Sequence, residues 1–103
     1  MKFGIALKPE LERPDSFAQT FVEVANNASE MGYQALWTSH RPTVRSAGED
    51  TLAPLISVAS LVHVVPNMLL GVNIVVLPLL DAVVVANQVA TLSRLSGERF
   101  ILG

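Results

Sequence analysis

Hydrophobic and polar positions along the chain alternate in blocks that predict strands and helices in turn. Residues 2–7 form a short apolar run typical of a buried strand, and residues 33–37 form a second one. Between them, apolar residues recur at the spacing of a single helix face: Phe17, Phe21, Val24, Ala28 and Met31. This spacing predicts a helix over residues 16–31 that packs on the two strands.

Residues with strong positional preferences mark the ends of that helix. Ser16 followed by Gln19 has the spacing of a capping box, in which the two residues satisfy free amides at a helix start. Gly32 is suited to the left-handed backbone that often ends a helix. After Gly32, residues 39–50 are polar and predict an exposed loop.

The second half of the chain repeats the alternation. We predict a second helix over residues 51–65, with Pro54 tolerated in its first turn. Residues 68–77 are rich in β-branched side chains and predict a third strand. Asp81 is a suitable N-cap for a third helix that reaches Leu95, and Ser96-Gly97 should end that helix. Residues 99–103 begin a fourth strand.

This order predicts an α/β fold whose parallel strands are joined by helical crossovers. Two architectures fit it: an open doubly wound sheet, or part of a (β/α)8 barrel. A complete barrel takes about 250 residues. We therefore expect residues 1–103 to form one domain, the N-terminal half of such a barrel, and the chain to be a fragment.

Composition narrows the classes of function. Half of the residues are apolar and only 16% are charged, so the chain carries more apolar surface than a globule of 103 residues usually buries. We therefore expect a partner, or further chain, to cover part of it. The net charge of −2 with no basic stripe argues against nucleic-acid binding. Without a signal peptide, the chain is expected to be cytoplasmic.

Residues 51–80 contain no charged side chain, which leaves a membrane hairpin as an alternative. Three prolines, two asparagines and His63 interrupt this stretch. Strands that are covered on both faces also read as continuous apolar runs, so buried α/β elements explain it better. We therefore expect no membrane span.

Motifs for nucleotide binding and hydrolysis are absent. The sequence has no G-x-G-x-x-G, no Walker loop, no G-x-S-x-G and no H-E-x-x-H. It has no cysteine, and its histidines are His40 and His63 alone, which are too few for a metal site without carboxylates. We expect no metal.

Four segments form a recognisable pattern in this order: residues 2–5 (KFGI), 28–37 (ASEMGYQALW), 70–71 (LG) and 91–103 (TLSRLSGERFILG). Together they resemble the N-terminal half of luciferase-like flavin monooxygenases, a group that includes the deazaflavin-dependent reductases. The last segment is the most specific match. The chain also departs from the family pattern, because His40 and Arg41 occupy the columns of an acidic residue and a histidine. Either His40 is the family histidine after a one-residue deletion, or it has replaced the acid.

The resemblance implies a set of site residues. His40 would be the catalytic acid or base, and Trp37 would line the substrate pocket. Gly71, Asn73 and Ile74 would support the flavin ring, through a strand bulge whose non-prolyl cis bond joins Asn73 to Ile74.

The resemblance also implies an oxidoreductase that binds FMN or coenzyme F420 and a small-molecule substrate. The phosphate site of such barrels usually follows strands seven and eight, so we expect little activity from this chain alone. The alternative is a non-catalytic half-barrel that forms homo-oligomers through its second and third helices.

Overall fold

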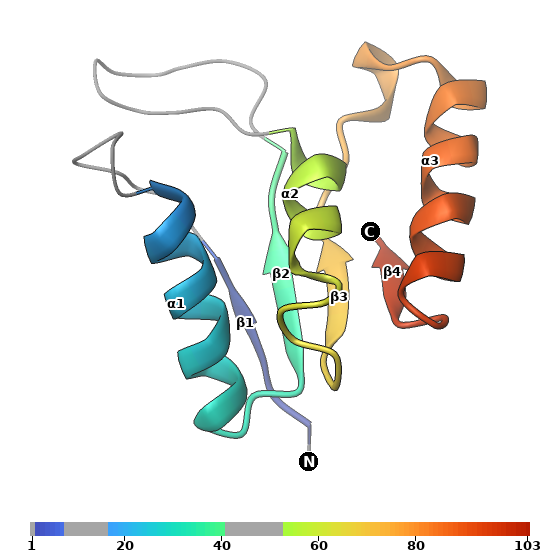
Figure 1. The fold of residues 1–103 in the computed structure, drawn as a ribbon. Coiled ribbons are helices and arrows are strands. Elements are labelled where there is room, and N and C mark those ends of the chain that lie inside the picture. Colours follow the sequence, from blue (N-terminus) through green and yellow to red (C-terminus); the bar gives the residue numbers. More distant parts are fainter. Residues whose placement is uncertain (1, 8–16, 41–52) are drawn as a thin grey trace, which may run out of the picture.

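A computed structural model describes residues 2–7, 17–40 and 53–103 (Figure 1). The elements run in the order β1 (Gly4–Ala6), α1 (Phe17–Glu30), β2 (Ala35–Thr38), α2 (Pro54–Leu61), β3 (Leu69–Val72), a 3-10 turn η2 (Leu77–Leu79), α3 (Ala82–Leu95) and β4 (Phe100–Leu102). The alternation that the sequence predicts is therefore confirmed for these residues.

The four strands form one parallel sheet in the order β1-β2-β3-β4. The described helices lie along one face of this sheet, in front of it in Figure 1. A doubly wound sheet would reverse its strand order and carry helices on both faces. The sequential order with one covered face is instead the arrangement of a (β/α)8 barrel segment.

The core lies between the helices and the covered face of the sheet. Leu36 of β2 and Leu70 of β3 point into it and are 1% exposed. Helix α1 contributes Ala25 and Ala28, which are buried, whereas Val24 is 42% exposed and Met31 is 73% exposed. The predicted inward stripe was therefore wrong at Val24 and Met31, because the small side chains at 25 and 28 are the ones that allow close approach to the sheet.

Helix α2 and strand β3 end several residues before their predicted ends. Helix α2 ends at Leu61 rather than near residue 65, and turns follow it. Strand β3 ends at Val72 rather than Leu77. The N–H of Asn73 still donates to the carbonyl of Thr38 on β2, but the amides after it do not continue this ladder. The N–H of Val76, for example, donates to the imidazole of His40.

Local signals in the sequence mark the start of α3 and the ends of α1 and α3. The carboxylate of Asp81 accepts hydrogen bonds from the N–H groups of Val83 and Val84. Gly32 after α1 has a φ of 90°, and Gly97 after α3 has a φ of 64°. The predicted N-cap and both glycine stops are confirmed, while Ser16 and the side chain of Phe17 lie outside the described residues.

The charge-free stretch builds ordinary elements of an α/β layer where the structure describes it. Residues 53–80 form α2, β3 and η2. Within the described parts of the chain, no helix combines the length and the apolar character that a membrane span requires.

A single cation holds the turns after α2. The guanidinium of Arg99 donates to the carbonyl of Val62 at 3.0 Å, of Val65 at 3.1 Å and of Met68 at 2.6 Å. These three residues are at most 3% exposed, so water does not replace the donor easily. Arg99 thus joins the amino end of β4 to the segment between α2 and β3.

We predict that Arg99→Leu lowers the free energy of unfolding by about 2–4 kcal/mol, because it leaves three buried carbonyls without a charged donor. Urea unfolding followed by circular dichroism measures this loss. The matched control is Arg94→Leu, which removes an exposed cation from the last turn of α3 and should cost less than about 1 kcal/mol. Equal losses in the two variants would contradict the role given to Arg99.

Candidate functional site

The uncovered face of the sheet has one large side chain at its centre. Side chains alternate between the two faces of a strand, so Trp37 lies opposite the core residue Leu36. The indole lies over both neighbouring strands: a Cβ built on Gly4 would lie 2.7 Å from its Nε1, and one on Gly71 would lie 2.4 Å from its Cζ3. The sheet accepts this ring because both glycines lack a side chain.

The structure thus brings Trp37 and Gly71 into direct contact, as a partly exposed ring over a buried backbone. The sequence predicted both residues but not their contact, and it gave no role to Gly4. The sequence did contain a signal for this contact, because Gly4 and Gly71 each lie within a predicted strand. A glycine inside a strand often marks the close approach of another group.

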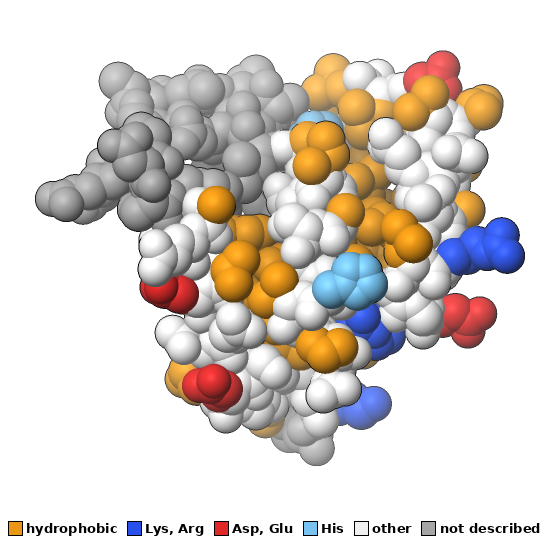
Figure 2. Space-filling model, viewed as in Figure 1, with side chains coloured by type: hydrophobic (Ala, Val, Ile, Leu, Met, Phe, Trp, Pro, Cys, Tyr) orange, Lys and Arg blue, Asp and Glu red, His pale blue; other side chains and the backbone are white. Residues whose placement is uncertain are grey.

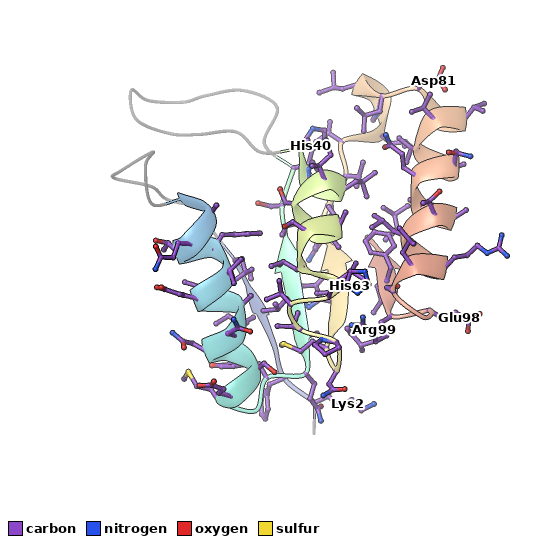
Figure 3. The ribbon with its side chains drawn as sticks, in the orientation of Figure 1. Lys2, His40, His63, Asp81, Glu98 and Arg99 are labelled. Atoms are coloured by element: carbon purple, nitrogen blue, oxygen red, sulfur yellow. The ribbon has the colours of Figure 1, made fainter. Side chains whose placement is uncertain are left out.

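His40 lies just beyond the carboxyl end of β2, near the upper end of the sheet in Figure 3. Its backbone N–H donates to the carbonyl of Ile74 at 3.3 Å. Its side-chain Nδ1 accepts from the N–H of Val76 at 3.1 Å. The predicted residues His40 and Ile74 are therefore neighbours, in the loops at the end of the sheet where barrels of this kind carry their active sites.

The segment after β3 has the backbone that the resemblance implied, with a cis bond between Asn73 and Ile74. The N–H of Asn73 donates to Thr38 of β2, and the N–H of Val75 donates to Gly103 beyond β4. The side chains of Asn73 and Ile74 are exposed, so Asn73 is not the buried amide that an inward position on a longer strand would give. Both side chains are available to a ligand.

Gly103 allows the end of β4 to lie close to this segment. A Cβ at this position would be 2.8 Å from the carbonyl oxygen of Val72 and 3.7 Å from the side-chain oxygen of Asn73. On β2, with β3 between it and Gly103, the buried hydroxyl of Thr38 has no hydrogen-bond partner among the described residues. The sequence analysis identified neither residue as part of the site.

Among the described residues, charged groups are sparse at this end of the sheet. Figure 3 places Lys2 and Arg99 at the opposite, amino end, and Asp81 near the carboxyl end. Arg94 is in the last turn of α3, which leads to the amino end of β4. The remaining basic residues, Lys8, Arg13, Arg41 and Arg45, lie outside the described residues.

The described residues thus offer an apolar ring and backbone groups to a ligand, but no cation for a phosphate. In the same residues, no three side chains of the metal-binding types come together. His63 is exposed beyond α2 and is not part of the candidate site.

Apolar side chains also gather outside the core, on η2 and the start of α3, at the upper right of Figure 2. Leu79 is 61% exposed, Val83 is 78% exposed and Val84 is 52% exposed. Exposed apolar groups in this number are typical of a surface that another molecule covers.

Comparison with solved structures finds the same fold in an enzyme of known activity. The chain superposes on the oxygenating constituent of 3,6-diketocamphane monooxygenase from Pseudomonas putida, a type II Baeyer-Villiger monooxygenase in complex with FMN, with a TM-score of 0.83. The two sequences are 17% identical, and the match covers 100% of this chain and 29% of the enzyme's chain. The chain therefore spans less than a third of that enzyme's length.

Sequence comparisons give the family. No protein of curated function is detectably similar to the chain. The profile of the luciferase-like monooxygenase family, however, matches residues 1–103. Since this match extends over the whole sequence and agrees with the barrel topology, the chain belongs to the luciferase-like monooxygenase family.

Proposed function

We propose that this chain supplies the part of a flavin-dependent monooxygenase site that lies against the flavin ring. The observation that carries the proposal is the pairing of a partly exposed indole, Trp37, with the segment 73–76 at the carboxyl end of the same sheet. Apolar and aromatic walls with a few backbone polar groups are typical of sites for flat cofactors. Family membership supports the choice of a flavin.

The described residues are suited to the flavin ring of FMN but not to its phosphate. Asn73 and Ile74 would lie against the ring, and Trp37 would form the adjoining wall of the substrate pocket. Gly71 would act through Trp37, because it leaves room for the indole that covers it. The phosphate would be held outside the described residues, because their basic side chains lie away from this end of the sheet. This division agrees with the usual phosphate site after strands seven and eight of such barrels.

The bound flavin would supply the redox chemistry of oxygen insertion into a small organic substrate. The residues of this chain would orient the ring, limit the access of water and present His40 at the rim of the site. FMN is the cofactor of the structural neighbour, which favours it over coenzyme F420. We expect the isolated chain to turn over little substrate.

Comparing FMN with riboflavin tests this proposal, since the two differ only in the phosphate. If the described residues hold the ring alone, both should bind weakly to the isolated chain, with dissociation constants within about threefold of each other. Quenching of flavin fluorescence measures both constants. Coenzyme F420 in the same assay tests the choice of flavin.

Two results would contradict the proposal. Binding of neither FMN nor riboflavin would remove the flavin site. A preference for FMN of about 100-fold or more, which two charge-assisted hydrogen bonds would give, would place the phosphate contact within this chain.

The exposed apolar side chains favour a second candidate function, a homo-oligomerising half-barrel. Helix α2 exposes Ile56 and α3 exposes Val83 and Val84, and the two helices pack side by side. In addition, the described sheet pairs β1 and β4 on one side only, which leaves strand edges that another chain can extend. A second copy of the chain is the occupant that we propose for α2 and α3.

We expect sedimentation velocity to show association that increases with protein concentration. Val83→Lys should shift the distribution towards monomer, since it places a charge in the proposed contact. Val24→Lys, a matched change at a partly exposed valine of α1, should leave the distribution unchanged. A wild-type chain that stays monomeric at high concentration would exclude this candidate.

A further inference from the structure

The imidazole of His40 is already engaged in a hydrogen bond within the protein. A backbone N–H can only donate, so the 3.1 Å contact from Val76 requires a lone pair on Nδ1. In the neutral ring the proton then lies on Nε2. While this bond is intact, neither nitrogen of the neutral ring offers a free lone pair to a substrate.

The contact joins residues that are distant in the sequence. His40 follows β2, while Val76 lies 36 residues later, beyond the end of β3. The backbone N–H of His40 donates to Ile74 in the same segment. Two hydrogen bonds from one residue therefore fix residues 74–76 against the end of β2.

The other bonds of this segment come from the backbone. Thr38 accepts from Asn73 on the β2 side, and Gly103 accepts from Val75 on the β4 side. Among the described residues, His40 is the one that contributes a side chain. Without its Nδ1, the N–H of Val76 would have no partner among the described residues, since the strand ladder has already ended.

We propose that His40 is a positioning residue: its Nδ1 holds the segment 74–76 in place at the carboxyl edge of the sheet, and its Nε2–H is a fixed donor. This inference rests on the proposed function in one respect, which is that the ligand beside segment 74–76 is a flavin. In this proposal His40 is not a general base. Its Nδ1 instead accepts a hydrogen bond from the N–H of Val76.

Two substitutions separate the two nitrogens of the ring. His40→Asn puts an oxygen where Nδ1 lies, so it can still accept from Val76, but it has no group at the position of Nε2. His40→Gln reaches the position of Nε2 and lacks the near acceptor. His40→Ala lacks both, and His63→Asn changes the exposed histidine as a control.

Hydrogen–deuterium exchange at the Val76 amide is the first measurement. It should be about tenfold faster in His40→Ala and His40→Gln than in wild type, and within about threefold of wild type in His40→Asn and His63→Asn. The amide of Leu70, which donates to Arg99 in the sheet, reports whether each variant remains folded. Unchanged exchange at Val76 in His40→Ala, or equal acceleration in His40→Asn and His40→Ala, would overturn the proposal.

A second measurement needs no change at His40. Because the chain has two histidines, the His63→Asn variant retains His40 alone. Nitrogen NMR of its labelled imidazole, recorded on the neutral form of the ring, should show an unprotonated Nδ1 and a protonated Nε2. The opposite tautomer would overturn the proposal.

Flavin affinity then separates this inference from the proposed function. If Nδ1 positions the site, His40→Asn should retain the affinity of wild type and His40→Gln should weaken it. The reverse order would assign the role to Nε2 and overturn the positioning role. If wild type binds no flavin, the proposed function fails, while exchange and NMR still decide the role of His40.

Discussion

The contact of the Trp37 ring with the backbones of Gly4 and Gly71 is the constraint on which the arrangement of the sheet depends. One side chain from the second strand covers the strands on either side of it, and a Cβ on either glycine would overlap the ring. Moving a strand by one residue would transfer its side chains to the other face. The ring therefore requires this register, with Trp37 beside Gly71 and Ala6.

The position of the candidate site follows from that register. With Trp37 opposite Gly71, Thr38 lies opposite Val72, and both strands end at the same level. His40 and the segment 74–76 then emerge close enough to share two hydrogen bonds. At the other end of the sheet, Arg99 closes the turns that lead into β3. Among the described residues, the bonds of Arg99 thus hold the amino end of the sheet, while the carboxyl end presents the segment 74–76, with the exposed side chain of Ile74.

Much of this could be predicted from the sequence wherever the determining interaction is local. Asp81 is two and three residues from the amides that it caps, and Gly97 acts on its own backbone, so both could be assigned from the pattern. The resemblance to the family further supplied the cis bond at Asn73 and the barrel topology. These features depend on neighbours in the chain or on a motif that spans them.

Features that depend on distant residues could not be predicted in the same way. The strands carry apolar residues on both faces, so alternation alone did not show that Trp37 lies away from the helices. The inward face of α1 was misassigned at Val24, because a small residue such as Ala25 carries little hydrophobic signal although it is 0% exposed. The bond between His40 and Val76 joins two loops that become neighbours only when the sheet forms.

The central claim is that Trp37 is accommodated because Gly71 has no side chain, and a double-mutant cycle tests it directly. Unfolding free energies would be measured for wild type, Gly71→Ala, Trp37→Ala and the double variant, by urea titration with circular dichroism. We expect Gly71→Ala to cost about 1–3 kcal/mol in wild type, because the new methyl group meets the ring. In Trp37→Ala it should cost at least about 1 kcal/mol less, since the ring is gone. Losses that add to within about 0.5 kcal/mol would contradict the claim that this contact fixes the sheet.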